Sequence, residues 1–282
     1  MKFLTKIPPA HTQRLAVTFL WSLTLLSLGM LLFVIAFILW HGLPHVTWGF
    51  LTETPRSMGR EGGIGPIIVG TLWVAGLAGL IAAPIGVTTA VYLTEYKREG
   101  KLTAVIRFGA DCLAGIPSII FGLFGFVFFV ITLGMGLSII SGALTLALMV
   151  LPTIIRTSEE AIRAVPRSYR DVSYGLGCTR WQMVTGVVLK AAMPGVGTGV
   201  VLAIGRSISE TAAVMLTAGS ALDMPRTMSD STRTMALHFY MLSREGISMT
   251  NAYATAAVLI VAILAINLLA YGIMRRFVAR VS

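Results

Sequence analysis

The sequence predicts an all-α polytopic membrane protein with six transmembrane helices. Of its 282 residues, 56% are hydrophobic and 12% are charged, whereas a soluble domain carries about 25% charged residues. Several apolar runs reach the roughly 20 residues that a helix needs to cross the bilayer core. Lysine and arginine are also divided unequally between the segments that join these runs, which is typical of a multi-pass membrane protein.

Six apolar segments are expected to span the membrane. The first, Leu15–Trp40, is longer than the roughly 7–15 residues of a signal-peptide core and is therefore interpreted as a retained helix. Several others contain proline, which predicts bends in the helices. They cover about residues 64–93 with Pro84, 107–133 with a break at Gly115–Ser118, 137–155 with Pro152, 187–218 and 252–274.

The basic residues predict the orientation of these helices. With both termini in the cytoplasm, 16 of the 22 Lys and Arg residues fall in inner segments and 5 in outer loops. Cytoplasmic loops carry such an excess. The net charge of +10 is therefore interpreted as a topology signal, and nucleic acid is not an expected partner.

The predicted spans and orientation divide the chain into a short inner segment, one separate helix and a larger core. The expected parts are a cytoplasmic segment at 1–14, the first transmembrane helix at 15–40, a core of five helices at 60–275 and a cytoplasmic tail at 276–282. The outer loop at 219–251 is expected to contain a short interfacial helix at Thr234–Leu242.

The inner loop at residues 156–186 carries signals for short helices beneath the bundle. Gly175 and Gly177 can end a helix, and Thr179 can cap the next one. The loop is basic and contains large aromatic residues at Tyr169, Tyr174 and Trp181. From the residues alone, it is either a solvated connector or a surface on which another protein docks.

Two charged residues lie inside the fifth apolar segment. Arg206 and Glu210 are spaced i,i+4, so one helix would bring them to the same face. A guanidinium presents a fork of donors that suits phosphate oxygens, and charges within the membrane often mark a pathway. The residues expected to line a substrate pathway are Arg206, Ser209, Glu210 and Thr211. The alternative is an Arg–Glu pair that only joins helices.

The third segment contains a second charged pair and a break. Arg107 and Asp111 are expected to form an i,i+4 pair at the membrane interface, with Arg107 extending toward water. A Gly-Pro break within a membrane needs protein or a water-filled cavity around it. We therefore expect a gate or hinge at Ile116, Pro117 and Ser118. In the fifth segment, Gly195 and Gly199 predict close helix packing.

The sequence contains no motif for catalysis or metal binding. No Gly-x-x-x-x-Gly-Lys-Ser/Thr phosphate loop is present, and the four histidines show no metal-ligand spacing. We expect a transporter subunit that is not itself an enzyme and that binds no metal or cofactor. Its energy would come from a partner or from an ion gradient.

The inner loop resembles the loop by which permeases of binding-protein-dependent ABC importers dock on their ATPase. Asp171-Val172-Ser173, Gly177 and Val187-Val188-Leu189 keep the spacing of that family's motif, although Lys190 occupies the place of its proline. Further segments resemble the phosphate-specific permeases, A-type. They are Leu93–Tyr96, Asp111–Ile119, Arg180-Trp181, Pro194-Gly195 and Ser209–Ala212.

This resemblance implies a type I ABC importer permease (MetI-like) fold and an inorganic phosphate importer in the bacterial inner membrane. The implied partners are membrane lipid, a second permease subunit, an ATPase dimer that binds ATP and Mg, and a periplasmic or extracellular phosphate-binding protein. The residues implied to dock on the ATPase are Arg170, Asp171, Gly177, Arg180 and Trp181. The alternatives are an ABC permease for sulfate or molybdate, and an ATP-independent ion-coupled transporter.

Overall fold

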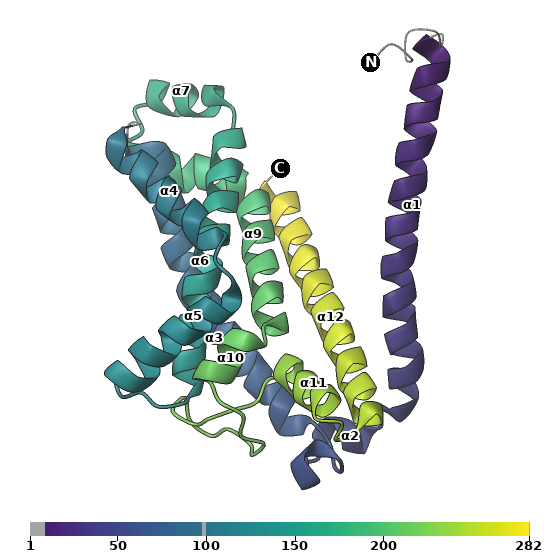
Figure 1. The fold of residues 1–282 in the computed structure, drawn as a ribbon. Helices are drawn as coiled ribbons and strands as arrows, with labels where there is room; N and C mark the ends of the chain where they lie inside the picture. The colour runs from purple at the N-terminus through teal and green to yellow at the C-terminus, as the bar shows by residue number, and fades with distance from the viewer. Residues whose placement is uncertain (1–8, 98–99, 282) are drawn as a thin grey trace.

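The computed structural model describes residues 9–97 and 100–281. Within these residues, the chain forms helices and no β-strand beyond one isolated bridge between Arg56 and Glu61. The helices (Figure 1) are α1 (Pro9–Gly42), α2 (Trp48–Thr52), α3 (Gly65–Val91), α4 (Lys101–Ala114), α5 (Ser118–Gly125), α6 (Ile139–Ala164), α7 (Arg167–Gly175), α8 (Arg180–Met183), α9 (Leu189–Ser209), α10 (Ala212–Thr217), α11 (Met235–Arg244) and α12 (Met249–Val281). Two short 3-10 helices, Leu43–His45 and Ser57–Gly59, and three π-helical segments, Tyr92–Tyr96, Phe126–Thr132 and Val184–Val188, complete the helical structure.

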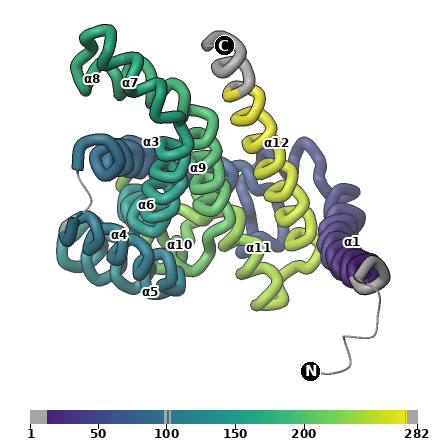
Figure 2. The backbone as a smooth tube through the Cα atoms, turned by 90° about the horizontal axis from the view of Figure 1, so that it is seen from above, coloured from purple at the N-terminus to yellow at the C-terminus, as the bar shows by residue number. Residues whose placement is uncertain are grey.

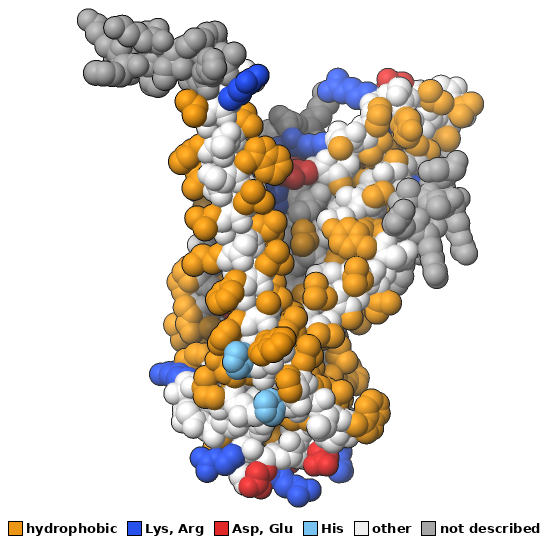
Figure 3. All heavy atoms as spheres, turned by 90° about the vertical axis from the view of Figure 1, so that its right-hand side faces the viewer, with side chains coloured by type: hydrophobic (Ala, Val, Ile, Leu, Met, Phe, Trp, Pro, Cys, Tyr) orange, Lys and Arg blue, Asp and Glu red, His pale blue; other side chains and the backbone are white. Residues whose placement is uncertain are grey.

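Five helices in the described chain are long and apolar enough to cross a membrane, and a bent helix pair brings the number to six if it forms one span. The five are 13–45, 65–96, 139–164, 180–209 and 249–272. The pair, 103–114 with 118–132, is bent by 101° at the expected Gly-Pro break. The structure therefore agrees with the predicted number of spans. On the face drawn in Figure 3, charged side chains gather toward the two ends of the molecule and hydrophobic side chains cover the band between them.

Two of the expected spans have different limits. The fourth helix, α6, continues beyond residue 155 to Ala164. The fifth begins at Arg180 and ends at Ser209, because Glu210 adopts an extended backbone with φ −75° and ψ 134°. Residues 212–217 form the separate helix α10, so the prediction of one helix over 187–218 was wrong at both ends.

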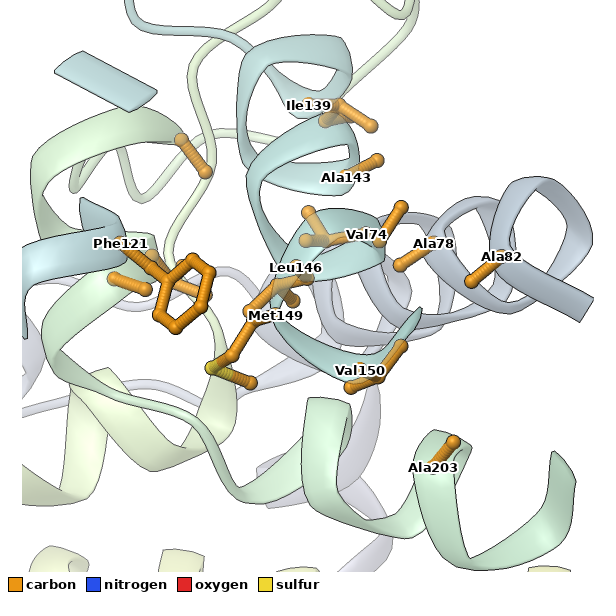
Figure 4. Close-up of a cluster of buried hydrophobic side chains, with 14 of the residues drawn as sticks. Val74, Ala78, Ala82, Phe121, Ile139, Ala143, Leu146, Met149, Val150 and Ala203 are labelled. Atoms are coloured by element: carbon orange, nitrogen blue, oxygen red, sulfur yellow. The ribbon is translucent and has the colours of Figure 1, made fainter. Parts of the chain in front are cut away.

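The core of the bundle lies where α3, α6 and α9 meet. Figure 4 shows Val74 and Ala78 of α3 close to Leu146 and Val150 of α6, with Ala203 of α9 beside them. These side chains are at most 1% exposed. Because lipid is as apolar as leucine, the helices are held mainly by close packing, which the many small residues permit.

Gly195 and Gly199 of α9 form the predicted close contact, and their partner is α6. A Cβ atom on Gly195 would lie 2.6 Å from the Cβ of Ala161, and one on Gly199 would collide with Thr157 Oγ1. Gly205, further along the same helix, has only Asn267 Oδ1 nearby, 3.9 Å from its Cβ position. The first two glycines therefore set the distance between α6 and α9.

We expect Gly199→Ala to destabilise the protein by about 1–3 kcal/mol, because the new methyl group overpacks the α6–α9 contact. The measurement is the Tm of the purified protein, with Gly205→Ala as the matched control on the same helix. Equal Tm values for the two variants would contradict a limiting contact at Gly199.

Helix α1 stands beside the bundle and touches it only near one end. Figures 1 and 2 both place it next to α12 and away from α3 and α6. The contact lies around Gly42, whose Cβ position is 2.7 Å from the Cβ of Ala257, and the ring of Phe37 lies 6.1 Å from that of Tyr253. None of the residues in the most apolar part of α1 is buried, so the apolar side chains of this helix lie on the surface of the chain.

Helix α11 corresponds to the short helix expected at 234–242, but it is more buried than an interfacial helix would be. Its inner face packs on α3 and α12 through Met235, Leu237, His238 and Leu242, each at most 2% exposed.

The bundle has two distinct ends. We call them the α7 end, toward which α1 begins and α12 finishes, and the α11 end (Figure 1).

Candidate functional site

The segment between α6 and α9 forms two helices joined by a glycine turn. Pro166 precedes α7, Gly177 has a φ of +80° in the turn, and Thr179 begins α8. Thr179 and Gln182 form a capping box: Gln182 N donates to Thr179 Oγ1 at 3.3 Å, and Thr179 N donates to Gln182 Oε1 at 2.9 Å. The predicted helix–turn–helix is confirmed, although α8 runs directly into the span that contains α9.

Arg170 attaches α7 to the ends of two long helices. Its Nη2 and Nε donate to Glu95 Oε1 at 2.6 and 3.0 Å. Nη1 donates to the carbonyl of Val165 at 2.8 Å, and Nη2 also donates to that of Ile162 at 3.0 Å. The side chains of Arg170 and Glu95 are 18% and 7% exposed. This pair therefore fixes α7 against the π-helical segment after α3 and against the end of α6.

Large apolar side chains remain exposed on the outer side of these two helices. Leu176 is 80% exposed and Trp181 66%, while Arg180 lies over the ring of Tyr96 with 5.8 Å between Cζ and the ring centroid. We call this exposed group the α7–α8 surface; it consists of Tyr169, Val172, Leu176 and Trp181. Exposed apolar patches of this kind mark interaction sites.

The charged residues at the start of the third span are paired differently from the prediction. Arg107 Nη2 lies 2.6 Å from Glu159 Oε1, and Asp111 Oδ1 lies 3.0 Å from Arg156 Nη1. Arg163 also reaches Glu159 Oε1, at 2.9 Å. The expected interfacial Arg107–Asp111 pair is replaced by two pairs that join α4 to α6, because the end of α6 extends as a helix beside α4.

The structure separates Arg206 from Glu210. Arg206 is in the last turn of α9, whereas Glu210 follows the end of the helix in an extended conformation. The i,i+4 relation that predicted a common face therefore does not hold. Within the described residues no ion pair involves Arg206, whose side chain is exposed; Ser209 Oγ donates to its carbonyl at 3.0 Å. Glu210 and Thr211, the two residues that follow Ser209, are half-buried.

The break at Ile116, Pro117 and Ser118 lies at the 101° bend between α4 and α5. Ile116 packs against the central core, and Pro117 is the residue before α5. The bend is therefore supported by protein on one side, as a break within a membrane requires.

A buried Arg–His contact at the α11 end was not predicted from the sequence. Arg233 is 4% exposed, its Nε donates to the carbonyl of Ser220 at 3.1 Å, and its Nη1 is 3.4 Å from His238 Nδ1. Burial first and the Arg233 charge second lower the pKa of His238 to about 3. His238 is therefore neutral, and its contact with Arg233 holds the loop before α11 in place. The two residues meet only in the folded structure.

In the part of the chain that the structure describes, no group of three His, Cys, Asp or Glu side chains could hold a metal ion. Cys112 and Cys178 are both free thiols.

Known proteins similar to this chain are membrane components of ABC transporters. The phosphate transport system permease protein PstA 1 of Mycobacterium tuberculosis is 34% identical over 94% of this chain and 88% of that protein. The probable ABC transporter permease protein YqgI of Bacillus subtilis is 31% identical over 92% of this chain and 94% of that protein.

One solved structure shows the same fold at low sequence identity. It is that of a bacterial alginate ABC transporter in complex with an alginate pentasaccharide-bound periplasmic protein, and it matches with a TM-score of 0.61 over 95% of each chain at 19% identity. The fold is accordingly that of the type I ABC importer permeases, as expected.

The model of the family described as binding-protein-dependent transport system inner membrane component matches residues 75–282, which include more than half of α3 and all of α4 to α12. The chain belongs to this family of ABC importer permeases, embedded in the inner membrane by several spans.

Proposed function

We propose that the chain is the transmembrane permease subunit of an ATP-driven inorganic phosphate importer. The observation that carries this proposal is the 34% identity to a phosphate transport permease along 94% of the chain. The match covers 94% and 88% of the two relatives' own length, so the similarity is not limited to one segment of either protein. The exposed guanidinium of Arg206 provides a group suited to an oxyanion.

The proposed orientation places the α7 end and both termini in the cytoplasm. It is supported by the excess of Lys and Arg in the segments assigned to that side, 16 against 5. Arg206, which is 26 residues beyond Arg180 at the opposite end of the fifth span, then lies toward the outer face. An anion arriving from outside would meet it early in its passage.

The proposed pathway residues are Arg206, Ser209, Glu210 and Thr211, where α9 ends. Arg206 would bind the anion directly, and the hydroxyl groups would complete its coordination as water is lost. Glu210 limits how strongly the anion is held, by its negative charge near the path. The proposed hinge at Ile116, Pro117 and Ser118 would let α5 move relative to α4 between outward- and inward-open states.

The α7–α8 surface is the proposed docking site for the ATPase, together with Arg170, Asp171, Gly177 and Arg180. The sequence contains no phosphate-loop motif of its own, so a separate ATPase dimer would bind ATP and Mg. A second permease would complete the pathway. An extracytoplasmic binding protein would deliver phosphate, since transport by this family depends on a binding protein.

We expect Gly177→Ala to weaken docking of the ATPase, because a side chain at a φ of +80° costs about 1–2 kcal/mol and so alters the turn between α7 and α8. The matched control is Gly175→Ala, since a Cβ at either glycine meets no atom within 4 Å. The measurement is the amount of ATPase that co-purifies with the tagged permease. Full recovery of the ATPase with Gly177→Ala would show that this turn is not needed for docking.

The substrate is tested by reconstituting the assembled importer in liposomes and measuring ATP hydrolysis with its binding protein. Phosphate is expected to stimulate hydrolysis, whereas sulfate and molybdate are expected to have little effect. Stimulation by sulfate or molybdate but not by phosphate would overturn the substrate assignment. ATP hydrolysis that depends on none of the three anions would overturn the assignment to an oxyanion importer.

A further inference from the structure

The two faces of α7 meet different surroundings. Tyr169 and Val172, which belong to the α7–α8 surface, are 49% and 63% exposed. Residues at positions i, i+3, i+4 and i+7 share one helical face, and on α7 such a set points away from that surface. It consists of Arg167, Arg170, Asp171 and Tyr174, all of which line a hollow between α7 and the bundle.

This hollow has a volume of about 500 Å³, within the range of about 300–1,000 Å³ that small-molecule sites occupy. Its other walls come from the end of the α3 span, from α4 and from the end of α6. They include Leu93, Thr94, Glu95, Lys97, Arg107, Arg163 and Val165. Segments that are distant in the sequence thus meet around one open space at the α7 end.

The lining of the hollow is strongly basic. Among the described residues it contains five Lys or Arg side chains and two carboxylates. One carboxylate, Glu95, is already bound by two nitrogen atoms of Arg170. Within residues 9–97 and 100–281, Lys97 and Arg167 are exposed and make no ion pair. These two cations line the hollow from different elements, Lys97 directly after the α3 span and Arg167 on α7.

We propose that this hollow binds a phosphate group, supplied either by free inorganic phosphate or by the headgroup of an anionic lipid. Lys97 and Arg167 are the direct ligands, because their donors are not engaged by carboxylates. Arg170 is a positioning residue that keeps α7 over the hollow. Basic pockets at the ends of transmembrane helices bind such headgroups, and a guanidinium can bind phosphate oxygens in pairs.

The site is distinct from the proposed pathway. Arg206 lies at the far end of the span that starts at Arg180, whereas the hollow lies beside α7. An anion bound between Lys97 and Arg167 joins α7 to the end of the α3 span, in parallel with the Glu95–Arg170 pair. Its binding therefore stabilises the attachment of α7, which gives a signal independent of transport.

The test uses the assembled importer with its nucleotide sites filled by ADP. In one arm, the Tm is measured in neutral detergent during titration with sodium phosphate, against sodium chloride at equal ionic strength. In the other arm, the Tm is compared in nanodiscs of phosphatidylcholine with and without phosphatidylglycerol. The variant is Lys97→Gln with Arg167→Gln, and Lys97→Arg with Arg167→Lys retains both charges. The control, Arg14→Gln with Lys190→Gln, removes the same charge from two exposed positions outside the hollow.

We expect the Lys97→Gln, Arg167→Gln variant to bind the phosphate group about tenfold or more weakly, because two charge-assisted contacts are lost. The control and the charge-retaining variant should respond as the wild type does. A difference confined to the phosphate arm identifies free phosphate, and one confined to the lipid arm identifies a headgroup. Equal responses of the wild type and the Lys97→Gln, Arg167→Gln variant in both arms, or an equal loss in the control, would overturn the proposal, whether or not the importer carries phosphate.

Discussion

Arg206→Gln is expected to lower the rate of phosphate uptake about 10- to 100-fold while leaving the importer assembled. A hydrogen bond to a charged group contributes about 1.5–3 kcal/mol, and about 1.4 kcal/mol corresponds to a factor of ten. Arg206 is exposed and makes no ion pair within the described chain, so its loss leaves no buried carboxylate without a partner. The effect should therefore appear in transport and not in stability.

The measurement for Arg206 is uptake of labelled phosphate by proteoliposomes, together with the Tm of the complex. Lys190→Gln is a matched control, because it removes an exposed positive charge near the other end of the same helix. Arg206→Lys keeps the charge but loses the fork of donors, so partial activity is expected. Uptake by Arg206→Gln near the wild-type rate would remove Arg206 from the pathway.

The sequence could predict the spans because the bilayer imposes a length and a composition on each of them. Apolar runs and the Gly-Pro break at Gly115–Ser118 are local features, and the structure has a span or a bend at each. The turn at Gly177 and the cap at Thr179 were also predictable, since both depend on a few adjacent residues. Close packing at Gly199 followed from the absence of a side chain.

The errors had two sources, a contact with a residue distant in the sequence and a helix that ends within an apolar run. Arg107 and Asp111 are close enough in sequence to pair with each other, but α6 continues beside α4 and offers Glu159 and Arg156 instead. For Arg206 and Glu210, the i,i+4 rule assumed that α9 continues, whereas it ends at Ser209. An apolar run does not reveal where a helix inside a membrane stops, because both the helix and the following α10 are apolar.

The remaining large effect is expected at the Glu95–Arg170 pair, which joins two segments 75 residues apart. Arg170→Leu leaves the carboxylate of Glu95, only 7% exposed, without its partner, and also frees the carbonyls of Ile162 and Val165. Removing one member of a buried ion pair costs about 3–5 kcal/mol. We expect α7 to detach from the bundle, with loss of ATPase co-purification and of phosphate-stimulated ATP hydrolysis.

Two further variants separate attachment of α7 from a direct contact between Arg170 and the ATPase. Arg170→Lys keeps the charge but replaces the planar guanidinium by a single ammonium, which loses the contact of two nitrogen atoms with Glu95, so an intermediate loss is expected. Glu95→Gln changes a side chain that lies beneath α7 and not on the α7–α8 surface, yet it should impair coupling in the same way as Arg170→Leu. If Glu95→Gln couples normally while Arg170→Leu does not, Arg170 acts through the ATPase and the pair does not transmit motion to α3. If both fail and the Tm falls with them, coupling needs this pair because it attaches α7 to α6 and to the segment after α3.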